Sequence, residues 1–369
     1  MAAAPSRAAA GEPTSETNYT VLAPIRQENL TVFPVVTGCG YSQREPSTRD
    51  EKQRAGVTVV STCIPRNTQE FLTLDEGLRS GEVVVTESGS VQPLIRRRTR
   101  MTPVHEGAQV NQLVLVNNSK RPLVLLAGEI VTGGKQDRVI AKDRIVPAES
   151  DPVDLGVFCV EPGRWVAKSA NFGALGGNMA APSVRLHAMK DKDQQQVWDS
   201  VRSAQTNIAK EVPRAAAEQV EVTSSYAGVM ENVEVQRKLD KVAAPIEHDY
   251  SKLIHELRDR NAVGVVVAVD GEIIWADIFA STQLLEKYWP KLVRSYATEA
   301  LVSRASEHEV NLKHAQAFID QLDGNHETVE REPGLYRHTE VNGDGYKVFV
   351  LASLLPKMGF DVHIAKMAE

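Results

Sequence analysis

The chain of 369 residues is poor in the residue types on which several protein classes depend. It has only three cysteines, and no two of them form a CxxC pair. This excludes a zinc ribbon, a thioredoxin-type motif and a scaffold stapled throughout by disulfides. One bridge, between Cys39 and Cys63, is expected only if the protein is exported. No run approaches the roughly 20 apolar residues that a spanning helix needs, so we expect no membrane insertion.

The motifs of common catalytic sites are also missing. HExxH is absent, the nine histidines have no metal-ligand spacing, and Ser90 lacks the framing glycines of a GxSxG elbow. The segment 128–136 resembles a P-loop, but Glu129 and Gln136 stand where the template needs Gly and Ser or Thr. We therefore expect no metal, no cofactor and no nucleotide bound by this route.

The charge balance excludes a further class of partner. Forty-two Lys and Arg against 48 Asp and Glu give a formal net charge of −6, which argues against nucleic acid. The single strong basic run, Arg96–Arg100, has no interleaved aromatic residues and predicts an exposed strand or loop. Localisation stays open. The absence of an export signal favours the cytoplasm, whereas the Ala-rich residues 2–10 would fit a processed periplasmic or secreted protein.

What the sequence does contain predicts an α+β fold. After a disordered lead at 1–20, residues 21–167 form a β-rich half whose short strands are separated by turns, not helices. This spacing is typical of an antiparallel, sandwich-like sheet. The one helix expected there, Leu74–Ser80, begins with a Thr73/Glu76 capping box and ends at Gly81.

The period of apolar residues changes in the second half of the chain. Residues 168–195, with the Gly-, Ala- and Ser-rich stretch 168–182, predict a flexible loop. In residues 196–369, apolar residues recur at spacings of three and four and so predict helices. Hairpins are predicted at Asp270–Gly271 and at 342–345. We expect this α+β half to pack on the first.

Two segments gather polar side chains that suit chemistry or binding. In the first, Glu129, Lys135, Gln136 and Arg138 surround a Gly133–Gly134 turn that allows close approach of the backbone. The turn can hold a polar ligand or form internal ion pairs, and a tight glycine turn between strands is the simpler interpretation.

The second segment follows a buried strand. Glu161, Arg164 and Trp165 bring together an acid, a guanidinium and an indole. They predict either a binding pocket or a loop pinned by Arg164 paired with Glu161 or Glu129. Cys159 is expected to be a small buried thiol, not a nucleophile.

These two segments also carry a family resemblance. LAGEIVTGGKQDRVI (126–140) and VFCVEPGRW (157–165) resemble the signature of the ARG and rhodanese/phosphatase-superfamily-associated protein domain, a bacterial family. The resemblance extends from about residue 20 to about residue 310 and implies no established reaction. Where the family commonly has GAKQNR, this chain departs at Gly134 and Asp137. It marks the polar residues of both segments for attention without assigning roles to them.

Asp277 is a further candidate. Strand alternation places it on the same face as Trp275 and Phe279, so its carboxylate is either paired or an acid/base group with a raised pKa. If the two halves pack together, Arg164 or Lys135 is the expected partner. The eight candidate residues are then expected at one place where the halves meet.

The failure of every catalytic and metal template favours a non-catalytic ligand-binding or protein-interaction module, with self-association as a further expectation. Its partner would be a small polar ligand or a protein. The first alternative is a hydrolase or transferase on a small polar, phosphorylated or ribosylated substrate. In that case Lys135 and Arg164 would hold an anion. The general base would be Glu129, Glu161 or Asp277.

A second alternative is a structural assembly protein. It depends on edge strands near Val32 and Val348 that would pair with another chain and make a homo-oligomer. Pro34 within the first of these strands favours an edge or a bulge.

Overall fold

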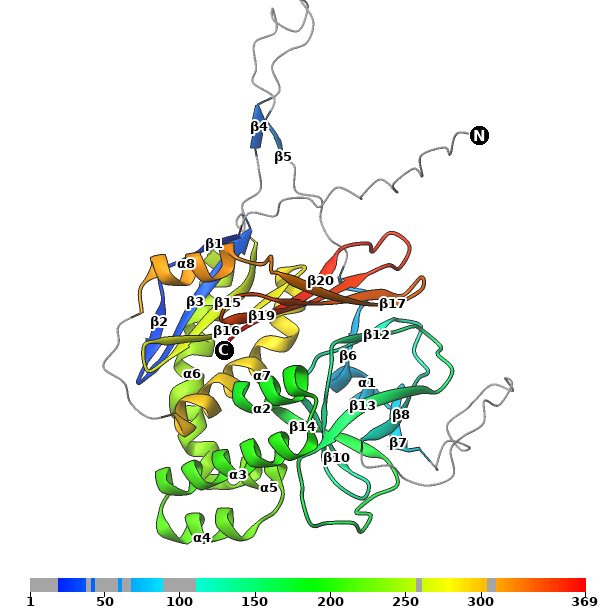
Figure 1. The fold of residues 1–369 in the computed structure, drawn as a ribbon, viewed down its shortest axis with the longest axis vertical. Coiled ribbons are helices and arrows are strands. Elements are labelled where there is room, and N and C mark those ends of the chain that lie inside the picture. The colour runs from blue at the N-terminus through cyan, green and yellow to red at the C-terminus, as the bar shows by residue number, and fades with distance from the viewer. Residues whose placement is uncertain are drawn as a thin grey trace, which may run out of the picture.

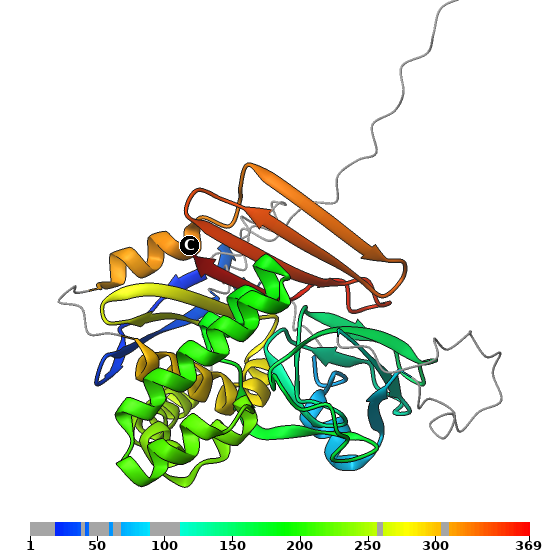
Figure 2. The same cartoon turned by 60° about the horizontal axis from the view of Figure 1, so that its bottom comes forward.

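The computed structural model describes residues 19–37, 41–43, 59–61, 68–88, 111–256, 261–303 and 310–369. Over this part of the chain the fold is α+β, as predicted, and its sheets are almost entirely antiparallel. Figures 1 and 2 show three regions: a large sheet at the top, a cluster of helices below it, and a small curled sheet at the lower right. Cys39, Cys63 and the basic run 96–100 lie outside the described residues.

The large sheet has nine strands and draws on both ends of the chain. Its order is β1-β3-β15-β16-β20-β19-β18-β17, and β2 pairs with β3 beside β1. The strands are β1 (Tyr19–Val21), β2 (Ile25–Gln27), β3 (Leu30–Thr37), β15 (Ala262–Val269), β16 (Glu272–Phe279), β17 (His326–Glu332), β18 (Tyr336–Asn342), β19 (Tyr346–Ser353) and β20 (Asp361–Ala368). β3 and β15 pair edge to edge inside the sheet. Each is a buried run of mainly β-branched residues, the composition typical of a strand covered on both faces.

The prediction that Val32 and Val348 lie in edge strands is wrong. β3, which contains Val32, has β15 on one side and both β1 and β2 on the other. β19, which contains Val348, lies between β18 and β20. Pro34 is accommodated because β1 pairs with residues 35–37 and β2 with residues 30–32. The proline therefore faces the gap between two short partners, where a missing N–H breaks no ladder.

The small sheet curls into a half-barrel of six strands in the order β14-β10-β11-β13-β8-β7. They are β7 (Val83–Glu87), β8 (Gln112–Asn117), β10 (Glu129–Gly133), β11 (Arg138–Ile140), β13 (Val153–Cys159) and β14 (Phe172–Met179). A bridge between Thr86 and Asn171 brings its two ends together. Two further groups of strands are short: β6 (Leu72–Thr73), β9 (Leu123–Leu125) and β12 (Arg144–Val146), and then β4 (Tyr41–Gln43) with β5 (Val59–Ser61).

The described residues form eight α-helices and one π-helix, most of which lie below the large sheet and beside the small one (Figure 1). They are α1 (Leu74–Ser80), α2 (Pro182–Leu186), the π-helix η2 (His187–Asp191), α3 (Gln194–Glu211), α4 (Arg214–Val222), α5 (Tyr226–Glu231), α6 (Val233–Glu256), α7 (Thr282–Val302) and α8 (Leu312–Asp320). α7 packs against β14, β15, α3 and α6, and for this reason it is buried on most sides. The predicted capping box at Thr73 is confirmed, and Ser281 caps α7.

The loop predicted for residues 168–195 is wrong, because the segment contains β14, α2 and η2. Its glycines and alanines have little β-propensity, and the strand forms through pairing with β10 and packing against α7. The expectation also missed β17 and α4, whose exposed residues carry little apolar periodicity.

Candidate functional site

The predicted glycine turn joins β10 to β11. Gly133 has φ +125° and Gly134 φ +47°, backbone conformations that favour glycine. A Cβ on Gly134 would lie 2.2 Å from the Phe172 ring and 2.8 Å from Glu87 Oε1. The glycine pair therefore serves a close approach inside the half-barrel, and a strand, not a helix, follows it.

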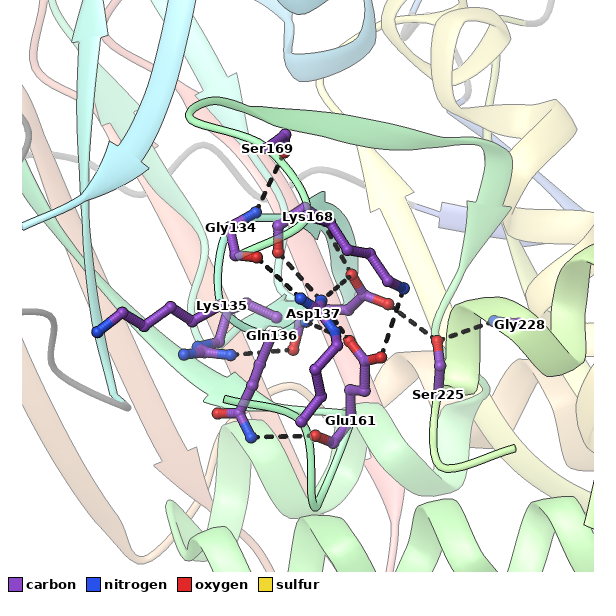
Figure 3. A network of polar contacts seen from close by, with 12 residues as sticks. Gly134, Lys135, Gln136, Asp137, Glu161, Lys168, Ser169, Ser225 and Gly228 are labelled. Carbon is purple, nitrogen blue, oxygen red and sulfur yellow. Dashed lines mark hydrogen bonds and ion pairs between the residues drawn. The ribbon is translucent and has the colours of Figure 1, made fainter. Parts of the chain in front are cut away.

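A buried acidic pair lies at the centre of this turn (Figure 3). Asp137 accepts from the Gly133 N–H at 3.0 Å and from the Ser225 hydroxyl at 2.9 Å. Glu161 accepts from the Asp137 N–H at 3.1 Å. Arg164 binds both carboxylates, at 2.5 Å to Glu161 and 3.4 Å to Asp137. The predicted Arg164–Glu161 pair is thus confirmed, and the alternative pairing of Arg164 with Glu129 is wrong.

The pKa values of the two carboxyls in this cluster are shifted in opposite directions. Burial and the neighbouring charge of Glu161 raise the pKa of Asp137 in spite of its hydrogen bonds. Burial also acts to raise the pKa of Glu161, but the hydrogen bond and charge of Arg164 outweigh it and lower that pKa. The Arg164 guanidinium therefore compensates the charge of Glu161 more completely than that of Asp137.

The same contacts fasten an exposed segment to the turn. Arg164 donates to the carbonyls of Gly134 at 2.8 Å and Val166 at 2.7 Å. The Lys168 N–H donates to the Gly134 carbonyl at 2.8 Å, and the Gly134 N–H donates to the Ser169 hydroxyl at 3.2 Å. Residues 165–169 are therefore solvent-exposed but fixed in place.

Two apolar side chains stand on this segment. Trp165 is 45% exposed and Val166 is 75% exposed. The Lys135 ammonium lies 4.8 Å from the centre of the Trp165 ring, a cation–π contact. Figure 3 shows Lys135 pointing away from the acidic pair, so its charge is directed outward.

The remaining residues near the turn are buried. Gln136 donates to the Glu161 carbonyl at 3.1 Å. Arg138 is fully buried, and its Nε and Nη2 have no hydrogen-bond partner in the described part of the chain. Cys159 is a free, fully buried thiol, as expected, and burial raises its pKa.

Glu129 belongs to a different cluster. It stands at the opposite end of β10 from Gly133, roughly 13 Å away at strand spacing. Its carboxylate accepts from Lys291 Nζ at 2.5 Å and from the Leu126 N–H at 2.7 Å, and Asp75 shares the same ammonium at 2.6 Å. Burial raises the pKa of Glu129, because the charge of Lys291 is divided between two acids.

Asp277 belongs to a third cluster. The prediction that Arg164 or Lys135 pairs with it is wrong. Arg185 in α2 donates to both of its carboxylate oxygens at 3.0 Å, and the Tyr296 hydroxyl donates to it as well. His363 Nε2 lies 3.1 Å from Asp277, and Nδ1 lies 2.5 Å from Asp143.

The third cluster is charged although it is fully buried. Burial alone would raise the pKa of Asp277, but the charges of Arg185 and His363 hold it well below its usual range. Burial would lower the pKa of His363, but Asp143 and Asp277 raise it to about 9. The His363 ring therefore connects the carboxylate of Asp277 in β16 with that of Asp143, just before β12.

The eight predicted residues thus do not form one site. Six lie around the glycine turn, whereas Glu129 and Asp277 belong to separate buried clusters. The interpretation from sequence missed Arg185, Lys291 and His363. Each of the three is a polar residue within a largely apolar segment, which signals a buried charge. That pattern does not identify the residue with which the charge pairs.

Within the described residues, no three His, Cys, Asp or Glu side chains are grouped to hold a metal ion. No helix in that part of the chain combines the length and apolar character that crossing a membrane would require.

The chain matches a known protein family over most of its length. The model of the ARG and Rhodanese-Phosphatase-superfamily-associated Protein domain matches residues 18–365. Neither the curated proteins nor the solved structures contain a match.

Proposed function

The chain belongs to the ARG and Rhodanese-Phosphatase-superfamily-associated Protein domain family, and from the geometry of the glycine turn we propose that it is a non-catalytic protein-interaction module. Its docking surface consists of Lys135, Trp165, Val166 and Lys168. The partner is an acidic segment of another protein that carries an apolar side chain.

The observation that carries this proposal is a rigid, exposed apolar pair. Trp165 and Val166 are exposed, yet hydrogen bonds from Arg164, Lys168 and Gly134 fix the backbone that presents them. A segment that is already ordered loses little conformational entropy when it binds. Tryptophan beside a cation is also the composition typical of an interface hot spot.

The charge of the surface determines the partner's chemistry. Residues 163–178 include Arg164 and Lys168 and contain no Asp or Glu. The acids that lie near the turn, Asp137 and Glu161, are buried. Lys168 pairs with the buried Glu161 at 3.4 Å, yet its side chain is 56% exposed, and Lys135 is directed outward. The exposed charge is therefore positive and complements an acidic segment.

The burial of the carboxylates favours binding over catalysis. Glu129 and Asp277 are 2% and 0% exposed, and each is held by a cation. A general base must reach the proton that it abstracts. These acids are sealed in mutual pairs, an arrangement that supports a structural role for them and a binding role for the exposed face.

Photo-crosslinking tests the proposal. A benzoylphenylalanine at position 165 or 166, in the full chain expressed in its native host, should crosslink to one acidic protein. Purified, that protein should bind the wild-type chain with an affinity that falls as salt concentration rises. The K135E/K168E variant should bind roughly tenfold more weakly or worse, since two attractive charges become repulsive.

Leu312 in α8 provides the matched control, because it is 45% exposed, as Trp165 is, and its helix packs on β1 of the large sheet. The same crosslinker at Leu312 should not capture that partner. Equal capture at both positions, or a partner that binds K135E/K168E unchanged, would contradict the proposal. A crosslink to a second copy of this chain would replace it with self-association, and turnover abolished by E129Q in a folded protein would replace it with catalysis.

A further inference from the structure

A small cavity lies at the β17 end of the large sheet, between strands β17–β19 and the π-helix η2. Its volume is about 50 Å³, and its walls include Met189 and Phe349. A volume of this size holds roughly four water-sized groups. None of the residues singled out around the glycine turn lines it.

His338 in β18 lines this cavity with an unpaired polar atom. The residue is 7% exposed, and its Nε2 has no hydrogen-bond partner among the described residues. A buried imidazole nitrogen without a partner costs free energy unless a ligand or water completes it. Burial lowers the pKa of His338, so the ring is neutral at neutral pH.

Charges of both signs surround the imidazole. Lys142 lies 2.5 Å from Glu330, and Lys192 lies 2.9 Å from Glu340. All four line the cavity together with His338. Glu330 is directly opposite His338 across β17 and β18, so both side chains lie on the same sheet face. With a neutral imidazole, the lining carries two positive and two negative charges.

The backbone opposite the sheet is also unusual. η2 is a π-helix, a form that is rare and frequent at functional sites. Lys192, which follows it, has φ +52°, a strained conformation for a lysine. This conformation places the Lys192 ammonium beside Glu340 at the cavity.

We propose that the cavity binds a small zwitterion, an α-amino acid of the size of glycine. Its carboxylate would bind Lys142 and Lys192 and accept from His338 Nε2–H, while its ammonium would bind Glu340 and Glu330. Each half of the ligand replaces one half of an existing ion pair, and Glu340 keeps a further partner in Lys347 at 3.3 Å. A simple anion would face both glutamates, and a simple cation would face both lysines. This inference does not depend on the proposed docking surface.

Histidine-labelled NMR tests the proposal on the full chain. Glycine should shift the His338 ring signal with a saturable, single-site isotherm and leave the exposed His326 signal unmoved. Sodium acetate and methylammonium chloride, each offering one charge of glycine, should produce no saturable shift. K192M and E340Q should each weaken glycine binding by roughly tenfold or more, since each removes one of the two charged side chains that pair with one end of the ligand.

Two variants complete the test. H338F should abolish the heat of glycine binding in isothermal titration calorimetry by filling the cavity, with folding checked by circular dichroism. E327Q is the matched control, because Glu327 alternates to the opposite face of β17 from Thr328, which lines the cavity. Absence of a saturable shift, an equal response to acetate, or full glycine affinity in both K192M and E340Q would each overturn the proposal.

Discussion

Arg185 and Asp277 form a bidentate ion pair in which both side chains are fully buried. The two N–O distances are 3.0 Å, and 92 residues separate the partners along the chain. The pair joins α2 to β16 and, through His363 and Asp143, connects both to the loop before β12. Gly128 allows this, because a Cβ there would lie 2.5 Å from the Arg185 side chain.

Arg185→Met should lower the free energy of unfolding by about 3–5 kcal/mol, since it leaves the Asp277 carboxylate buried without its main partner. The double variant R185M/D277L should be less destabilised than R185M, because it removes the orphaned charge as well. Urea unfolding of the two variants measures this coupling. A double variant at least as unstable as R185M would contradict the reasoning.

The exposed pair Arg214–Glu218 gives the control for this prediction. Its side chains are 94% and 67% exposed. Arg214→Ala should change the free energy of unfolding by no more than about 0.5 kcal/mol, because solvent already screens the pair.

Stability should fall as pH rises from about 6.5 to about 8. The pKa of His363 is about 9 in the folded state, against 6.5 without the fold. Its stabilisation is complete below pH 6.5 and is lost as pH rises towards 9, at roughly 1.4 kcal/mol for each unit. Burial lowers the pKa of Lys366 to about 8, so this residue contributes the opposite slope above that pH. The decline should therefore flatten between pH 8 and 9.

Urea titrations at closely spaced pH values check this profile. His363→Gln should remove the decline between pH 6.5 and 8, and His326→Gln, at an exposed position, should retain it. A wild-type stability that rises across this window would show that His363 does not carry its charge in the fold.

Gly134→Ala should destabilise this chain by about 1–3 kcal/mol through overpacking. The new methyl would meet the Phe172 ring at 2.2 Å. Phe172→Leu in the same background should recover part of the loss. Gly173→Ala, which would have no atom within 4 Å of its Cβ, should stay within about 0.5 kcal/mol of wild type in the same thermal or urea measurements.

Asp137→Asn should preserve or raise stability at neutral pH. Burial and Glu161 raise the pKa of Asp137, so its ionised form is disfavoured in the fold. Asparagine removes this penalty and keeps an oxygen to accept the Gly133 N–H. Asp137→Ala removes the acceptor and should cost about 1–3 kcal/mol. Unfolding of both variants at pH 7 and pH 8 compares them, and an Asn variant as unstable as the Ala variant would contradict the prediction.

Much of the local structure could be predicted because its signals lie close together in sequence. The Thr73/Glu76 capping box, the Asp270–Gly271 hairpin and the Arg164–Glu161 pair each span only a few residues. β14 could not be predicted in this way, since its glycines acquire strand geometry only from β10. The partners of Glu129 and Asp277 were equally out of reach, being 162 and 92 residues away.

The amino-acid sequence by itself determined the fold class, the turns and the residues that surround Gly133 and Gly134, because backbone dihedrals and short-range hydrogen bonds depend on near neighbours. Only the tertiary structure decided which charges meet. The pairing of β3 with β15 and the placement of α7 bring together groups that are distant along the chain. Burial then requires each group to find a partner of opposite charge, and for this reason the predicted polar residues separate into three clusters.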